Sequence, residues 1–370
     1  MSRHTLRTST EQQKISNFLY SEDSTTTIPQ RFVEFCRLSV EGIRGNVLYT
    51  EPEIPPNFGG TEYDGAESST LNLNPVDTEN IVPLQPIQTS RPVVAVDTPT
   101  LKLGELEDGV LCALRGAIVL LEDGHYRFVR YGPFVFLLGY NTPVALDHFA
   151  NLGLPPFSGE PNIDNLLKRV RNMLERWLQF NVSTSTHNAF VLIDGSLTAG
   201  TPDNPSRELE RILENTRRSN SVLIAISKKT RLRVNNESLT ELLEKQQDPC
   251  VLDVDTEVTE QFPPYPVRFL GRVFVGKLAK LGFPFRIDLD RLVPPLHAVR
   301  AFGELMGTDI VDQGYPETLR LAHIFSTFTA TDVLAMQSFA TAHLGVQLVP
   351  KVALRRSLFG PFGTAWEAYH

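Results

Sequence analysis

Apolar residues recur along the chain in two patterns, which predict strands and helices in a definite order. Short runs rich in β-branched residues predict buried strands in RPVVAVDTPT, NAFVLIDGSL and SNSVLIAISKK, which begin at Arg91, Asn188 and Ser219. Two further runs, VLCALRGAIVLLE and HYRFVRYGPFVFLL, are joined across Asp123 and Gly124, a dipeptide typical of a β-hairpin. The first three strands are therefore predicted to form an antiparallel meander.

Helical periodicity is clearest over residues 163–180, IDNLLKRVRNMLERWLQF, where apolar side chains form one stripe. A second helix is predicted to open at Asn204-Pro205-Ser206 and to run through Arg218. Beyond it, the pattern predicts further strands over residues 263–288 and helices over residues 294–343.

The N-terminal quarter of the chain differs from the rest. Residues 1–27 are polar and lack a period, and residues 50–90 are rich in Pro, Asn, Gly, Glu and Thr, which predicts a loose arm and a long loop or linker. Between them, residues 28–45 place Phe32 and Phe35 on one face of a short helix, which we expect to pack on the core or to join an interface. The predicted divisions are an N-terminal arm, short helix and linker (1–90), a main domain (91–350) and a C-terminal tail (351–370).

The order of elements up to Lys229 is β-β-β-α-β-α-β. Three hairpin-linked strands followed by strands that alternate with helices predict a mixed sheet in an α/β domain. This is the topology of the ribonuclease H-like fold, here with added C-terminal helices and an N-terminal extension.

Composition narrows the class of protein. The 370 residues include 43 acidic and 35 basic side chains and are 41% hydrophobic, as expected for a soluble globular protein. No apolar run approaches the roughly 18 residues of a membrane span, and the N-terminus has no apolar signal core, so we expect a cytoplasmic protein without membrane contact. The three cysteines, Cys36, Cys112 and Cys250, are widely spaced and predict buried free thiols.

Candidate chemistry lies at the ends of two predicted strands. VVAVD ends in Asp97 and FVLID ends in Asp194. Neighbouring strand ends would bring the two carboxylates together, and a divalent cation would compensate their charge. Mg²⁺ and Mn²⁺ prefer oxygen ligands, and such ions can activate water for phosphodiester cleavage. The same aspartates could instead cap turns or the helices that follow.

Tyr315 and His323 form a second candidate pair in GYPETLRLAHIF. Their spacing of eight residues would place them on similar faces of a helix. The histidine could ligate a metal or carry a proton, and the tyrosine could contact a phosphate oxygen. The alternative is a structural role for both residues, which is the more common one for such a pair on spacing alone.

Taken in order, VVAVD, FVLIDGSL, SVLIAISKKTRL and GYPETLRLAH resemble the NurA family of nucleases over residues 91–343. The resemblance implies a ribonuclease H-like core, manganese-favoured cleavage of DNA with 5′ to 3′ exonuclease and single-strand endonuclease activities, and a homodimer. It also implies a partner, the HerA hexameric translocase, in DNA end processing. The chain has no GxxxxGK[ST] phosphate loop of its own, so we do not expect it to be the ATPase.

Positions in the family carry over to this chain residue by residue. The resemblance implies that Asp97 and Asp194 ligate Mn²⁺ or Mg²⁺ and that Tyr315 and His323 complete the site, with His323 a possible ligand. The family also has a glutamate on the helix before the second aspartate, and Glu175 is the best match. Its helical angle points away from the apolar stripe, so a solvent-exposed role remains open.

A basic cluster follows the strand SVLIAIS, and the resemblance places its first lysine near the scissile phosphate. We expect DNA contact there, with a solvated strand end as the alternative. The cluster comprises Lys228, Lys229, Arg231 and Arg233.

One departure from the family bears on activity. The family's first strand commonly continues Asp-Gly-Ser, whereas Thr98-Pro99-Thr100 follows Asp97 here and cannot form the same turn of positive φ. This leaves open a non-catalytic adaptor that keeps the nuclease fold as a DNA-binding partner of a translocase. A ribonuclease with the same carboxylates is a further alternative.

Overall fold

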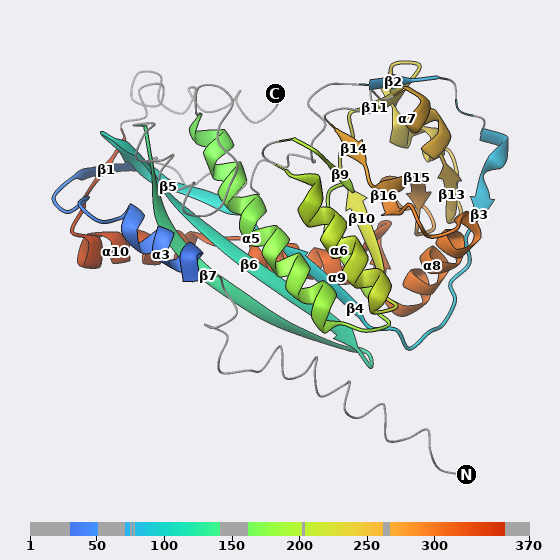
Figure 1. Ribbon diagram of the computed structural model, residues 1–370, viewed down its shortest axis with the longest axis horizontal. Coiled ribbons are helices and arrows are strands. Elements are labelled where there is room, and N and C mark those ends of the chain that lie inside the picture. The colour runs from blue at the N-terminus through green and yellow to red at the C-terminus, as the bar shows by residue number, and fades with distance from the viewer. Residues whose placement is uncertain are drawn as a thin grey trace, which may run out of the picture.

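The computed structural model describes residues 30–50, 71–74, 76, 78–140, 162–201, 204–261 and 267–351. A large mixed sheet with helices on both faces dominates it (Figure 1). In its central part, β4 runs parallel to β8 and β8 to β10, whereas β6 is antiparallel to both β4 and β7. The strand order is β7-β6-β4-β8-β10, which is the ribonuclease H-like arrangement predicted from the sequence. These strands are β4 (Val93–Asp97), β6 (Gly109–Glu122), β7 (His125–Gly139), β8 (Phe190–Asp194) and β10 (Val222–Ser227).

One strand near the centre was missed by the sequence pattern. β5 (Thr100–Leu106) continues from β4 along the same edge of β6, so that Asp97 pairs with Ala117 and Thr100 with Leu114. On its far side β5 pairs with β1 (Val47–Thr50), which pairs in turn with β19 (Gln347–Pro350). The polar residues within TLKLGEL lie on its exposed side, which weakens the apolar signal of this strand.

The sheet continues past β10 through β16 (Phe285–Asp290), β15 (Gly271–Lys277), β13 (Cys250–Asp253) and β3 (Val82–Pro83). Together with β14 (Arg268–Phe269), β15 and β16 confirm the strands predicted over residues 263–288. β13 was not predicted.

Short elements complete the β structure. β2 (Leu71–Leu73), β11 (Leu232–Val234) and β12 (Glu237–Ser238) form a small sheet, and β9 (Thr198–Ala199) pairs with β14. Residues 50–90 are therefore not all loop, because their described part contains β2, β3 and the 3₁₀ turn η1 (Thr78–Asn80). The loose arm predicted over residues 1–27 lies outside the described residues.

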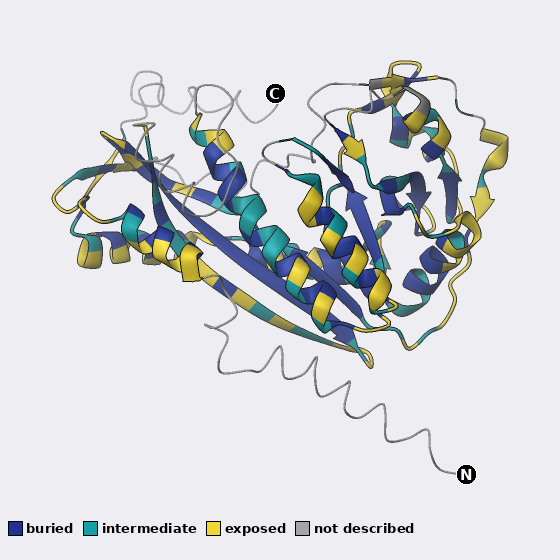
Figure 2. Cartoon of the chain, viewed as in Figure 1, coloured by how far each residue is buried: buried dark blue, intermediate teal, exposed yellow. Residues whose placement is uncertain are grey.

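Three helices cover one face of the sheet. They are α3 (Gln30–Ser39), α5 (Ile163–Ser185) and α6 (Ser206–Arg218), all of which were predicted. On each of these helices the buried residues lie on the side of the sheet and the exposed residues on the outer side (Figure 2). Phe32 and Phe35 of α3 lie in the core cluster with Val94 and Val96 of β4. Their burial contributes on the order of 2 kcal/mol each, which docks this N-terminal helix on the core.

The opposite face is covered by α8 (Pro295–Thr308), α9 (Glu317–Ser326) and α10 (Ala330–Phe339), with a π turn at Ala340–Leu344. These confirm the helices predicted over residues 294–343, except that β17 (Val311–Asp312) and β18 (Tyr315–Pro316) form a hairpin between α8 and α9. Two smaller helices, η2 (Leu239–Leu243) and α7 (Asp255–Gln261), lie elsewhere in the chain.

The cysteines are free and buried, as predicted. Among the described helices, none has the length and apolar character needed to cross a bilayer.

Candidate metal centre

Asp97 is the last residue of β4. Alternate residues of a strand share one face, and Val93 and Ala95 pack with α9 residues in the core beneath that helix. Asp97 therefore faces α9 as well. There its Oδ2 lies 3.2 Å from His323 Nδ1 and accepts a hydrogen bond of 2.5 Å from Ser326 Oγ.

Burial alone would raise the pKa of the Asp97 carboxyl. The hydrogen bonds from His323 and Ser326, together with the charges of His323 and Lys228, outweigh that effect, and the pKa is lowered. The Asp97 contact in turn raises the pKa of His323, against the opposing effect of burial. Asp97 thus remains an anion in this environment, although it is largely shielded from solvent.

Asp194 leaves the sheet at the C-terminal end of the neighbouring parallel strand, β8. The register pairs Val96 with Ile193, so the next residues, Asp97 and Asp194, emerge side by side. Lys228 Nζ donates a 2.8 Å hydrogen bond to Asp194 Oδ2. Burial raises the pKa of Asp194, and the negative charge of Asp97 adds to this, while the ammonium of Lys228 opposes it.

The turns after the two aspartates differ. Gly195 has a φ of +111°, which glycine adopts without steric cost. After Asp97 the chain instead passes through Thr98 and Pro99 directly into β5, and Thr98 is buried. The different turn predicted from Thr98-Pro99 is therefore found.

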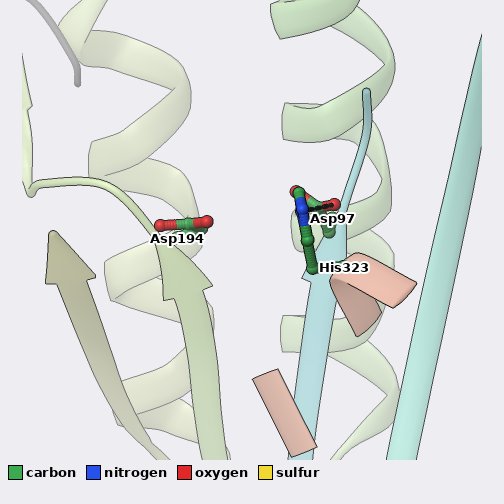
Figure 3. Close-up of side chains that lie close together, drawn as sticks. All are labelled: Asp97, Asp194 and His323. Atoms are coloured by element: carbon green, nitrogen blue, oxygen red, sulfur yellow. Dashed lines mark hydrogen bonds and ion pairs between the residues drawn. The ribbon is translucent and has the colours of Figure 1, made fainter. Parts of the chain in front are cut away.

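Asp97, Asp194 and His323 each place a potential ligand atom within 4.8 Å of the other two (Figure 3). Two carboxylates and an imidazole are suitable donors for a divalent cation such as Mn²⁺, since carboxylate oxygen is the preferred ligand and imidazole is tolerated. Two buried carboxylates at neighbouring strand ends also carry a desolvation cost that a cation would offset. The residues therefore fit a metal site.

Glu175 lies on α5 with its side chain 16% exposed, so the solvent-exposed role left open by the sequence is wrong. Gln179 Nε2 donates a 3.0 Å hydrogen bond to Glu175 Oε1, and Arg171 Nε lies 3.8 Å from Oε2. Burial raises the pKa of Glu175, the charges of Arg171 and Arg176 oppose this, and the charges of Asp97 and Asp194 add a smaller rise. Glu175 therefore belongs to the same electrostatic environment, although it lies outside the group of three ligand atoms.

Tyr315 does not share a helix with His323. It lies in β18, and α9 begins only at Glu317, so the helical spacing argument for this pair is wrong. The Tyr315 ring nevertheless lies 5.5 Å from Lys228 Nζ and packs against the ring of Phe285. It thus borders the site through Lys228.

The basic cluster divides into two parts. Lys228 is half-buried against Asp194, whereas Lys229, Arg231 and Arg233 are exposed. Arg231, just before β11, and Arg233 within it flank the buried Leu232 and are both exposed. The structure therefore joins only the first lysine to the carboxylates.

Two groups of site residues were not anticipated from the sequence. Ser326 binds Asp97 from the last residue of α9. On β16, two strands from β8, the buried carboxylate of Asp288 accepts a hydrogen bond from Leu197 N at 2.9 Å and is held by Arg286, which also donates to Thr198 Oγ1. This ion pair fixes the chain just after Gly195. The alternating charges of FRIDLD in a buried strand were the available signal, since buried charges require partners.

No protein-family model matches the sequence, and no curated protein matches it. Three solved structures of NurA are similar in fold. The crystal structure of the NurA nuclease from Sulfolobus solfataricus has a TM-score of 0.49 at 13% identity, covering 71% of this chain and 88% of that one. A second crystal structure of NurA has a TM-score of 0.45 at 10% sequence identity, and the match covers 72% of this chain and 91% of that one. The crystal structure of NurA bound to dAMP and manganese has a TM-score of 0.42 at 10% sequence identity, and the match covers 70% of this chain and 90% of that one. At these identities the likeness concerns the fold and not the activity.

Proposed function

We propose that the protein is a divalent-metal-dependent deoxyribonuclease whose centre is formed by Asp97, Asp194 and His323. The observation that carries this proposal is the gathering of their ligand atoms within 4.8 Å at the ends of two adjacent parallel strands. Carboxylates so placed are costly to bury and serve no packing role, which favours a chemical one. The ribonuclease H-like sheet supports the proposal by analogy only.

Mn²⁺ or Mg²⁺ would be held by Asp97 and Asp194, with His323 and Glu175 as further ligands. When bound, such a cation lowers the pKa of water and stabilises negative charge on a phosphodiester. An Nδ1–H donated to Asp97 would orient the His323 ring and leave its Nε2 lone pair available. Burial raises the pKa of Glu175, which favours its protonated form more than in an exposed glutamate and suits a group that accepts a proton.

Lys228 would bind the phosphate group. Its ammonium now neutralises Asp194, and a cation at that carboxylate would free it to contact a phosphate oxygen. Tyr315 would steady Lys228 and the phosphate beside it. The exposed cations Lys229, Arg231 and Arg233 would extend the contact along the DNA backbone, because clustered basic side chains neutralise phosphates.

The specific cleavage activities, the homodimer and the translocase partner that we propose rest on the sequence resemblance to the NurA family. The activities are 5′ to 3′ exonuclease and single-strand endonuclease cleavage in DNA end processing, by a homodimer that works with a HerA-like hexameric translocase. The four motifs that carry the resemblance include Asp97, Asp194, Lys228, Tyr315 and His323.

Cleavage of end-labelled single- and double-stranded DNA tests the proposal, with Mn²⁺, with Mg²⁺ and with chelator. We expect metal-dependent cutting that Asp97→Asn and Asp194→Asn abolish. Asp164→Asn is the matched control, because Asp164 is an exposed aspartate paired with Lys102 on the surface. Folded protein that never cuts DNA would contradict the proposal and favour the non-catalytic adaptor. Cutting of RNA alone would favour the ribonuclease.

A further inference from the structure

The loop between β15 and β16, residues 278–284, exposes two large apolar side chains. Leu281 is 74% exposed and Phe283 is 63% exposed. A single exposed apolar residue is ordinary on a protein surface, but two within three residues of one loop form a local apolar surface. We refer to Leu281 and Phe283 as the rim pair.

The rim pair lies at the same end of the sheet as the carboxylates. β16 pairs with β10 so that Arg286 is opposite Ser227, and Phe285 therefore flanks Lys228. The Phe285 ring packs on Tyr315, whose ring is 5.5 Å from Lys228 Nζ. Because adjacent strands are 4.7–4.9 Å apart, β16 lies about 10 Å from β8, the strand that ends in Asp194.

The loop is held firmly from both sides. Hydrogen bonds run from Leu281 N to Gln247 O at 2.9 Å and from Phe283 N to Gln313 O at 2.8 Å. A Cβ at Gly282 would come within 2.8 Å of backbone atoms in the hairpin of β17 and β18, so the two backbones are in direct contact. The apolar side chains are thus presented on a fixed support.

Leu281 also has a strained backbone. Its φ is +56°, in the left-handed region that bulky residues avoid. Since most of its side chain is exposed, burial does not compensate the strain. An exposed leucine in a backbone conformation that glycine favours points to a binding role rather than to packing.

We propose that the rim pair is a stacking site for an unpaired nucleobase of the strand held at the metal centre, an inference that rests on the proposed function. An aromatic ring offers a flat face on which bases stack irrespective of sequence, and a branched aliphatic side chain can wedge against a base beside it. Lys280 in the same loop and Lys229 after β10 are exposed cations, which suits a polyanionic ligand rather than an apolar protein surface. Lys280 lies 3.9 Å from Asp248, an exposed pair that solvent screens.

The test is binding of a single-stranded DNA oligonucleotide carrying 2-aminopurine, measured with the full chain in chelator so that metal-dependent cleavage is absent. We expect Phe283→Ala to raise Kd roughly 5- to 100-fold, the loss of one base–aromatic stack, and to relieve the quenching of 2-aminopurine. The slope of log Kd against log salt should stay unchanged, because the ring neutralises no phosphate. Phe283→Tyr should restore binding.

Two further variants separate binding from folding. Leu281→Gly removes the side chain and the strain, so it should weaken DNA binding while Tm stays equal or rises. Leu296→Ala is the matched control, since Leu296 is 83% exposed and follows the opposite end of β16. Its Kd should match wild type.

The proposal is overturned if Phe283→Ala binds DNA with unchanged Kd, or if it changes the mass measured by light scattering, which would make the rim pair a protein interface. Failure of the nuclease proposal can be distinguished from failure of the stacking site. Phe283-dependent binding by a protein that cuts no DNA with any metal would sustain the stacking site and overturn the nuclease. Metal-dependent DNA cleavage together with DNA binding that does not depend on Phe283 would overturn the stacking site alone.

Discussion

Lys228 Nζ lies 2.8 Å from Asp194 Oδ2, so a side-chain ammonium neutralises one of the two carboxylates at the candidate metal centre. A divalent cation and this lysine would therefore compete for the same oxygen. The competition links metal binding to release of Lys228, which would then be available to a phosphate.

Replacing Lys228 with methionine separates these two effects. Lys228→Met should bind Mn²⁺ about tenfold more tightly, because it removes a competing positive charge. It should also cut DNA roughly 100-fold more slowly, through loss of a charged hydrogen bond to phosphate. Electron paramagnetic resonance titration and single-turnover cleavage measure the two quantities, with Lys245→Met, at an exposed lysine outside the proposed DNA contact, as the control. Weaker metal binding by Lys228→Met would contradict this account.

The buried pair of Arg286 and Asp288 should be essential to stability. Asp288→Asn leaves Arg286, which is 1% exposed, without its ionic partner and should lower the free energy of unfolding by about 3 kcal/mol. Asp253→Asn, which removes the more exposed partner of Arg272, should cost less than about 1 kcal/mol. Urea denaturation followed by circular dichroism measures both. If both variants lowered the free energy of unfolding equally, burial of the ion pair would not determine the loss of stability.

The pair of Arg115 and Asp332 predicts a dependence of stability on pH. The hydrogen bond from Arg115 lowers the pKa of Asp332 well below its usual range, despite partial burial. A carboxyl with a lowered pKa stabilises the fold above its unfolded pKa, and this contribution is lost as pH falls toward the folded value.

Asp332→Asn should therefore lower the free energy of unfolding by about 2 kcal/mol at pH 7, and its difference from wild type should shrink below about pH 4. Denaturant titrations of both proteins from pH 7 to pH 3 test this. A difference that stays constant over the whole range would rule out the charge of Asp332 as the cause.

The thiols report on packing of the core. Burial raises the pKa of Cys36 and of Cys112 to about 12 and raises that of Cys250 as well. Thiolate is the reactive form, so the three cysteines should react with Ellman's reagent at pH 8 only after unfolding. Rapid reaction of one thiol in the native protein, lost in Cys36→Ala, would show that α3 is not docked on the sheet.

The strands β4 and β8 and their aspartates could be predicted because each apolar run is short, its four apolar residues are buried, and it ends in a charge. β5 could not, because it includes the exposed polar residues Lys102 and Glu105 and its register shifts between Lys102 and Gly104. The helical pattern also could not predict that Glu175 is largely buried beside the two aspartates. The helical pattern shows only that Glu175 lies off the apolar stripe, whereas its burial depends on contacts with Gln179 and Arg171 beside the end of the sheet.

Contacts between distant segments set the remaining part of the site. Ser326 meets Asp97 across 229 residues of sequence, and Tyr315 reaches Lys228 from a hairpin that the helical reading of GYPETLRLAH concealed. Neither contact follows from local spacing, because both depend on how α9 and the hairpin before it cross the sheet.

The central claim is that one acidic centre binds the cation on which cleavage depends. Mn²⁺ occupancy and DNA cleavage should be measured on the same samples of wild type, Asp194→Asn and Asp164→Asn. We predict that Asp194→Asn loses tight Mn²⁺ binding and cleavage together while its Tm is retained, and that Asp164→Asn matches wild type. Cleavage by Asp194→Asn at the wild-type rate, or cleavage by wild type in chelator, would contradict the claim.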